Sequence, residues 1–169
     1  IPYPSAEVIT TLPVDNTNER RVFLPAIYPI PVDIVALDTS GQVDQYKDRI
    51  KGIEITAITA KVTSNTFPVT VQPITLRVGE ASDTFDSAAT AATIPEIGVG
   101  QTPQSHSAAI DDAQRTAVGN IIAGLDFNLG ARTSILIPEG TPPAGGSVSM
   151  KLHIKLDVVA SLSSLAGVN

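Results

Sequence analysis

Residues 146–159 read Gly-Ser-Val-Ser-Met-Lys-Leu-His-Ile-Lys-Leu-Asp-Val-Val, an almost unbroken alternation of apolar and polar side chains. A period of two places one set of side chains on each face of a β-strand. One face carries the apolar residues from Val148 to Val158, and the other carries Lys151, His153 and Lys155. The pattern predicts a long strand with one buried and one exposed face, of the kind found in antiparallel sheets.

The composition of the whole chain also favours a β-rich fold. Of its 169 residues, 43% are hydrophobic, but aromatic residues make up only 4% and tryptophan is absent. Small and β-branched side chains such as Ala, Val, Ile and Thr pack well between sheets. This length is enough for one domain with a substantial core. The lack of cysteine excludes disulfides, thiolate metal sites and cysteine nucleophiles.

A second apolar stretch, residues 50–62, changes its phase halfway. Ile53 and Ile55 share one phase of the alternation, whereas the apolar residues from Ile58 onward share the other. A change of phase within a strand is typical of a β-bulge, or of a strand that is buried on both sides. We therefore expect a strand with an irregularity near Thr56.

The next segment is expected to turn back as a hairpin. Residues 64–66, Ser-Asn-Thr, have the composition of a turn, and an apolar return strand follows over residues 67–78. Pro73 lies within that return strand and has no N–H to donate to a sheet. The strand is therefore expected at an edge, or interrupted at Pro73.

Helical spacing occurs in residues 111–125. Asp111 or Asp112 is a suitable N-cap, and the apolar residues that follow recur three or four positions apart. Gly119 weakens the interior of a helix by about 1 kcal/mol relative to Ala. The helix is therefore expected to run from about Asp111 to Gly119, with strand resuming near Asn120.

Together these features predict an all-β fold with a single domain. The expected architecture is an antiparallel β-sandwich, jelly roll or immunoglobulin-like, with one short helix in a crossover loop. Periodicity does not encode strand order, so both topologies stay open. We divide the chain into an extended, Pro-rich N-terminal arm at residues 1–33 and a β-sandwich domain at residues 34–169.

The arm is proposed from its six prolines. Proline fixes φ and pushes the preceding residue toward extended geometry, so a helix is not expected here. The arm would either wrap around its own sandwich or reach a neighbouring subunit and add to the edge of its sheet. The side chains expected to anchor such a subunit contact are Val22, Leu24, Ile27 and Tyr28.

The charge distribution argues against nucleic acid as a partner. The net charge is −6, and residues 80–146 hold eight acidic residues against Arg115 and Arg132. A basic stripe for phosphates is missing, and these acidic loops are expected to be solvated. Nor is any apolar stretch long enough to span a bilayer, so membrane insertion is not expected.

Catalytic chemistry is not expected either. His106 has Ser105 and Ser107 beside it and Asp111 and Asp112 after it, which brings together the residue types of a catalytic triad. A triad requires its members on different rigid elements, whereas these residues follow one another in a stretch expected to be a loop. The chain is therefore expected to be no enzyme and to use no cofactor.

Two binding functions stay open as alternatives. Glu80, Asp83 and Asp86 are spaced three apart, unlike the ligands of an EF-hand, but the loops of sandwich domains do bind Ca²⁺ with looser spacing. A glycan-binding surface would need exposed aromatic rings, of which few are available. The tyrosines of the chain are Tyr3, Tyr28 and Tyr46.

These observations favour a non-enzymatic structural subunit of a larger assembly, either a virion shell or an extracellular or cell-surface assembly. Its expected partners are further copies of itself or other subunits, contacted through the arm and the sheet edges. The alternative is an adhesin-like module that binds a receptor or a glycan. Its ligand would contact loops at one end of the sandwich, such as residues 80–86 and 101–112.

Overall fold

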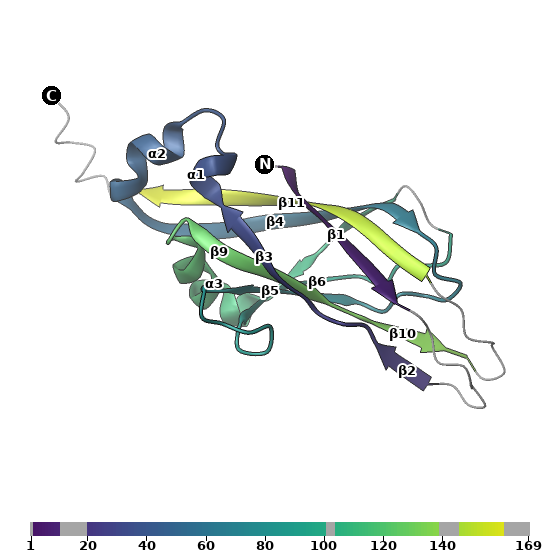
Figure 1. Cartoon of the computed structure of the whole chain (residues 1–169). Coiled ribbons are helices and arrows are strands. Elements are labelled where there is room, and N and C mark those ends of the chain that lie inside the picture. Colours follow the sequence, from purple (N-terminus) through teal and green to yellow (C-terminus); the bar gives the residue numbers. More distant parts are fainter. Residues whose placement is uncertain (1, 11–19, 101–103, 139–145, 161–169) are drawn as a thin grey trace, which may run out of the picture.

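The structure is a computed structural model that describes residues 2–10, 20–100, 104–138 and 146–160. Its strands are β1 (Pro2–Thr10), β2 (Arg20–Phe23), β3 (Ile27–Asp33), β4 (Ile50–Asn65), β5 (Ile74–Gly79), β6 (Ala89–Ile94), β7 (Gln104–Ser107), β8 (Ala109–Ile110), β9 (Asp126–Arg132), β10 (Ser134–Ile137) and β11 (Gly146–Ala160). The helical segments are α1 (Ile34–Leu37), α2 (Gln42–Tyr46), α3 (Arg115–Ile122) and the 3₁₀ turns η1 (Lys47–Arg49) and η2 (Asp112–Gln114). The strands form antiparallel sheets that stack as a sandwich (Figure 1), which confirms the all-β prediction.

The strand order decides between the two sandwich topologies. One sheet has the order β1-β11-β4-β7, the other has the order β3-β9-β5-β6-β8, and β10 and β2 form a separate two-stranded ribbon. In an immunoglobulin-like sandwich the first two strands pair within one sheet. Here the first strand pairs with the last, and the chain crosses repeatedly from one sheet to the other, as in a jelly roll.

The bulge expected in the second apolar stretch is confirmed in β4. Lys155 of β11 lies opposite Ala57, but the next residue, Leu156, lies opposite Ile55, so Thr56 is an extra residue on β4. The Thr56 hydroxyl donates a hydrogen bond of 3.3 Å to the Lys155 carbonyl. Because the bulge shifts the phase, the apolar residues on both sides of Thr56 point into the core.

The alternation of β11 is also confirmed over most of its length. Its apolar residues from Val148 to Ile154 are at most 4% exposed, while Lys151, His153 and Lys155 between them are exposed. Toward the end of the strand this difference fades. Val158 lies on the apolar face and is nevertheless 50% exposed. The buried face of β11 therefore ends before the strand does.

The described parts of residues 1–33 belong to the sandwich. β1 pairs with β11, β2 with β10, and β3 with β9. Proline is compatible with β3 because this strand lies at the edge of its sheet, where an N–H donor is not needed on one side. The described extended segments of residues 1–33 therefore follow the first of the two routes expected for the arm: they wrap their own sandwich and supply three of its strands.

The hairpin expected at residues 64–66 is wrong, because β4 and β5 lie in different sheets. The Asn65 side chain accepts a hydrogen bond from the Phe67 N–H and donates one to the Gly98 carbonyl, both at 3.1 Å, and so fixes the crossover. β5 begins directly after Pro73, so the interruption there is confirmed. The alternative of an edge strand is wrong, since β5 lies between β9 and β6.

Aspartates organise the helical segments. The Asp111 carboxylate accepts hydrogen bonds from two backbone N–H groups of η2, which confirms its role as a cap. The short helices α1 and α2 lie between β3 and β4 in the chain. Between them, Asp38 accepts from the Ser40 hydroxyl and from the Val43 N–H, and these bonds lower the pKa of its carboxyl group.

The predicted end of the main helix is wrong. Helix α3 continues through Gly119 to Ile122, and strand resumes only at Asp126. Gly119 does not end the helix but lets it approach β4: a Cβ at this position would lie 2.7 Å from the carbonyl oxygen of Ile53. A close approach of backbone to backbone is one of the few reasons to keep glycine inside a helix.

The core lies between the sheets and extends beneath α3. It consists mainly of aliphatic side chains, each worth about 1.5–3 kcal/mol when fully buried. The largest fully buried residues are Leu24, Ile58, Phe67, Ile74, Leu76, Ile94, Ile97, Ile122, Leu129, Ile135, Ile137 and Met150. Residues near the beginning and the end of the described chain, such as Leu24 and Met150, therefore contribute to one core.

Candidate functional site: strand edges and exposed apolar residues

The side chains predicted as subunit anchors lie against their own sandwich. Leu24 is 2% exposed and belongs to the core, and Val22 and Ile27 are partly buried against that core. Leu24 is thus held within its own chain, because the strands on either side of it are paired there, and its role as a subunit anchor stays a prediction. Tyr28 is also partly buried.

Tyr28 belongs to an aromatic and cationic cluster on the outer face of the sheet that contains β3, β9 and β5. Its ring meets Phe85 edge-on, with 6.4 Å between the centroids. The guanidinium groups of Arg77 and Arg132 lie 5.1 Å and 4.6 Å from the centroid of the Phe85 ring. Cation–π contacts of this kind hold the loop before β6 on the sheet. The Tyr28 side chain therefore makes its contacts within its own chain.

The acidic residues of the same loop are engaged locally. The Asp83 carboxylate accepts hydrogen bonds from the Glu80 N–H at 2.8 Å and from the Ser87 hydroxyl at 2.9 Å. Asp86 forms an ion pair of 3.1 Å with Arg132. Among the residues that the structure describes, no group of three or more His, Cys, Asp or Glu side chains converges as metal ligands would. The loop thus folds around its own carboxylates.

His106 lies in strand β7 and not in a loop, which corrects the expectation from the sequence. Neighbouring residues of a strand point to opposite faces, so Ser105 and Ser107 are directed away from the imidazole. Asp111 is occupied as a helix cap. The His106 Nε2 and the Gln104 Oε1 are buried without a hydrogen-bond partner in the described structure. Inward polar groups on an edge strand discourage further pairing.

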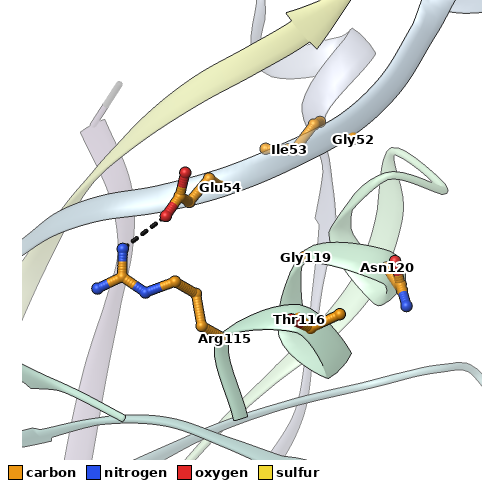
Figure 2. A pocket seen from close by; sticks show the side chains of 7 residues that line it. All are labelled: Gly52, Ile53, Glu54, Arg115, Thr116, Gly119 and Asn120. Atoms are coloured by element: carbon orange, nitrogen blue, oxygen red, sulfur yellow. Dashed lines mark hydrogen bonds and ion pairs between the residues drawn. The ribbon is translucent and has the colours of Figure 1, made fainter. Parts of the chain in front are cut away.

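A recess of about 300 Å³ lies between β4 and α3. Figure 2 shows Arg115 extending from the helix to Glu54 on the strand, with 2.6 Å between Nη1 and Oε1. The hydrogen bond to Glu54, and next to it the one to Asp112, raise the pKa of Arg115. The cation is therefore satisfied by its own chain, and the pair ties α3 to β4.

Phe23 is an exposed aromatic residue that the sequence analysis did not single out. It is 68% exposed, the largest fraction among the bulky hydrophobic residues of the described chain. A recess of about 260 Å³ lies beside it, with Arg21, Gln72, Thr75 and Arg132 among its lining residues. The sequence does not show which of residues 22–24 points outward, because all three are apolar. Once Leu24 points inward, Phe23 must point outward.

The comparisons with known proteins add little to this geometry. No protein-family model matches the sequence, and no curated protein matches it either. A solved structure titled Desmodium yellow mottle tymovirus is similar over 96% of this chain and 86% of its own chain, with 10% sequence identity and a TM-score of 0.24. A TM-score this low carries no argument about fold or function.

The described surface exposes bulky apolar side chains on strands at two places. Phe23 is exposed on the ribbon of β2 and β10, and Val158 and Val159 are 50% and 53% exposed near the end of β11. In Figure 1 these two ends lie on opposite sides of the sandwich. None of the helices in the described ranges is long and apolar enough to cross a bilayer.

Proposed function

We propose that the chain is a non-enzymatic structural subunit of a larger assembly, either a virion shell or an extracellular or cell-surface assembly. It would contact further copies of itself or other subunits through its strand edges and exposed apolar side chains. The observation that carries the proposal is Phe23, which is 68% exposed on a two-stranded ribbon at one end of the sandwich. An exposed aromatic side chain of this kind is characteristic of protein interfaces.

Two further features support this proposal. Jelly-roll sandwiches serve as shell subunits, and also as lectin domains and cupins, so the topology allows a structural role without selecting it. Several charged groups of the described surface are bonded within the fold, as Arg115 is to Glu54 and Asp83 is to Ser87. These features therefore support a role in subunit contacts more than a role in catalysis.

The proposed contact differs from the one expected from the sequence. Because β1, β2 and β3 are strands of their own sandwich, the N-terminal segment does not have to reach a neighbour. The proposed neighbour instead meets outward residues of these strands. We add Phe23, the most exposed of these neighbouring residues, to the predicted anchors Val22, Leu24, Ile27 and Tyr28.

The proposal predicts that Phe23→Ser weakens self-association without destabilising the fold. Burying a Phe side chain in a contact is worth about 1.5–3 kcal/mol, so the association constant should fall about ten- to a hundredfold. Sedimentation equilibrium at several concentrations would measure this constant. Val99→Ser is the matched control, because Val99 is 55% exposed and lies outside both strands of the ribbon. A wild-type chain that stays monomeric at every concentration would contradict the proposal.

One observation keeps the adhesin-like alternative as a second candidate. The recess beside Phe23 combines an exposed aromatic ring with polar groups of Arg21, Gln72 and Thr75, which is a combination that suits a sugar or another polar ligand. A glycan array probed with the wild-type chain and with Phe23→Ser would separate the two functions. If the wild-type chain is monomeric and binds a glycan, and Phe23→Ser abolishes that binding, the adhesin-like module is favoured over the structural subunit.

A further inference from the structure

The outer half of β11 is paired on one side only. β1 pairs with β11 from Gly146 to His153, where Pro2 is the last described partner. Beyond that point β11 continues to Ala160 and, among the described strands, pairs with β4 alone. Figure 1 shows β11 running past β1 toward α2. Residues 154–160 thus have one strand edge without a partner in the described chain.

The hydrogen bonds of β11 show which residues direct their main-chain groups to this edge. The carbonyls of Ser147, Ser149 and Lys155 all accept hydrogen bonds from threonine hydroxyls on the β4 side, at 3.2–3.3 Å. Successive residues of a strand direct their main-chain groups to opposite edges. The residues whose N–H and C=O groups are directed to the unpaired edge are therefore Ile154, Leu156 and Val158.

Other edges of the sandwich carry features that discourage pairing. β3 has Pro29 and Pro31, which cannot donate to a new strand. β7 has the inward polar side chains of Gln104 and His106, and β8 is only two residues long. Residues 154–160 contain neither proline nor an inward polar side chain. The outer half of β11 is therefore a sheet edge well suited to accept another strand.

We infer that a second copy of this chain pairs with residues 154–160 in antiparallel orientation, about a twofold axis at Leu156. In this register Leu156 faces the partner's Leu156, and Ile154 faces the partner's Val158. On the other face, Lys155 lies opposite the partner's Asp157, and Asp157 lies opposite the partner's Lys155. The inference rests on the proposed function, because it names one partner and one contact of that structural subunit.

The charges select this register. Sliding the partner by two residues in one direction places Lys155 opposite the partner's Lys155, and in the other direction places Asp157 opposite the partner's Asp157. Like charges directly opposite each other destabilise a strand pair, whereas opposite charges stabilise it. A slide by one residue would set polar side chains on the apolar face. The sequence of this edge is therefore complementary to itself in one register.

The edge of β2 does not have this property. Its sequence is Arg-Arg-Val-Phe, which contains no acidic residue. Antiparallel pairing of two copies through β2 would gather arginines from both chains without a compensating charge. Phe23 is thus suited to contact by its side chain, while the outer half of β11 is suited to main-chain pairing between two copies.

Charge reversal tests the inference directly. Lys155→Asp leaves only acidic side chains facing one another across the proposed pair, and Asp157→Lys leaves only basic ones. Each variant alone should therefore associate about tenfold or more weakly than the wild type. An equimolar mixture of the two variants should recover association, because every facing pair is then opposite in charge. Sedimentation velocity and native mass spectrometry would measure both effects.

Lys151→Asp is the control, since it makes the same charge change on the same exposed face where β1 covers the edge. Thermal unfolding confirms that each variant folds. Wild-type assembly that K155D and D157K leave unchanged would overturn the inference, although the proposed function would stand. Loss of association with no recovery in the mixture would overturn it as well. A wild-type chain that never associates would remove the proposed function itself.

Hydrogen exchange separates a second copy from a segment of the same chain. The amides of Ile154, Leu156 and Val158 should exchange fast in dilute solution and become protected as concentration rises. The neighbouring amide of Lys155 is directed toward β4 and should be protected at every concentration. Protection of all of these amides at every dilution would show that the same chain covers the edge, and would overturn the inference.

Discussion

Replacing Leu24 by Ala is expected to lower the free energy of unfolding by about 2–5 kcal/mol, the usual cost of truncating a buried Leu. Leu24 is 2% exposed, and its N–H donates a hydrogen bond of 3.0 Å to the Thr133 carbonyl. The backbone is thus held at the junction of β2 and β3, and the truncated side chain leaves a cavity that the sheets cannot readily fill. Urea denaturation followed by circular dichroism would measure the loss.

Phe23→Ala is the matched control for this experiment. It removes a larger side chain from the adjacent position, but Phe23 is 68% exposed, so the expected change is within about 0.5 kcal/mol. The pair of variants also tests whether the N-terminal segment belongs to the folded unit in solution. Equal denaturation midpoints for both variants would show that residues 20–24 do not pack into the core, and would restore the projecting arm as the correct description.

The prolines of residues 1–33 left the route of this segment open for a definite reason. Proline specifies an extended backbone and a missing donor, and both properties fit an arm as well as an edge strand. The choice between them depends on whether an edge of the same sandwich is available, which is a property of the whole fold. Residues 27–33 are extended as expected, but they are extended along β9.

The faces of the strands could be predicted because periodicity reports burial directly. An apolar face could be predicted for each of two stretches, with a change of phase in one of them, and both faces pack into one core, as β4 and β11 show. Strand order could not be predicted in the same way. The turn at Asn65 has the same local composition whether the chain returns to its own sheet or crosses to the other, and only the long-range pairing decides.

The exposure of Phe23 could not be predicted from the sequence. An apolar run such as Val22-Phe23-Leu24 predicts an alternation without its phase, so the sequence does not decide which of these side chains points outward. The self-complementary edge at Lys155 and Asp157 is visible in the sequence. Its significance depends on knowing that the described pairing of β1 reaches along β11 only to His153, so that the following residues have no second partner among the described strands.

Replacing Gly119 by Ala is expected to destabilise the protein, although the same change usually stabilises a helix by about 1 kcal/mol. The reason is that a Cβ at position 119 would lie 2.7 Å from the carbonyl oxygen of Ile53, a backbone atom that a rotamer change cannot move. Forcing α3 away from β4 costs about 1–3 kcal/mol, which is typical of overpacking. We expect the melting temperature to fall by a few degrees, measured by calorimetry.

Gly52→Ala supplies the contrast, because Gly52 lines the same recess (Figure 2) and a Cβ there would meet nothing within 4 Å. This change should therefore leave the melting temperature close to that of the wild type. The two glycines differ in one respect that matters: only Gly119 lies where a helix touches the backbone of a strand. If G119A melts at the wild-type temperature or higher, helix propensity outweighs that contact, and α3 is not held against β4 as closely as the structure describes.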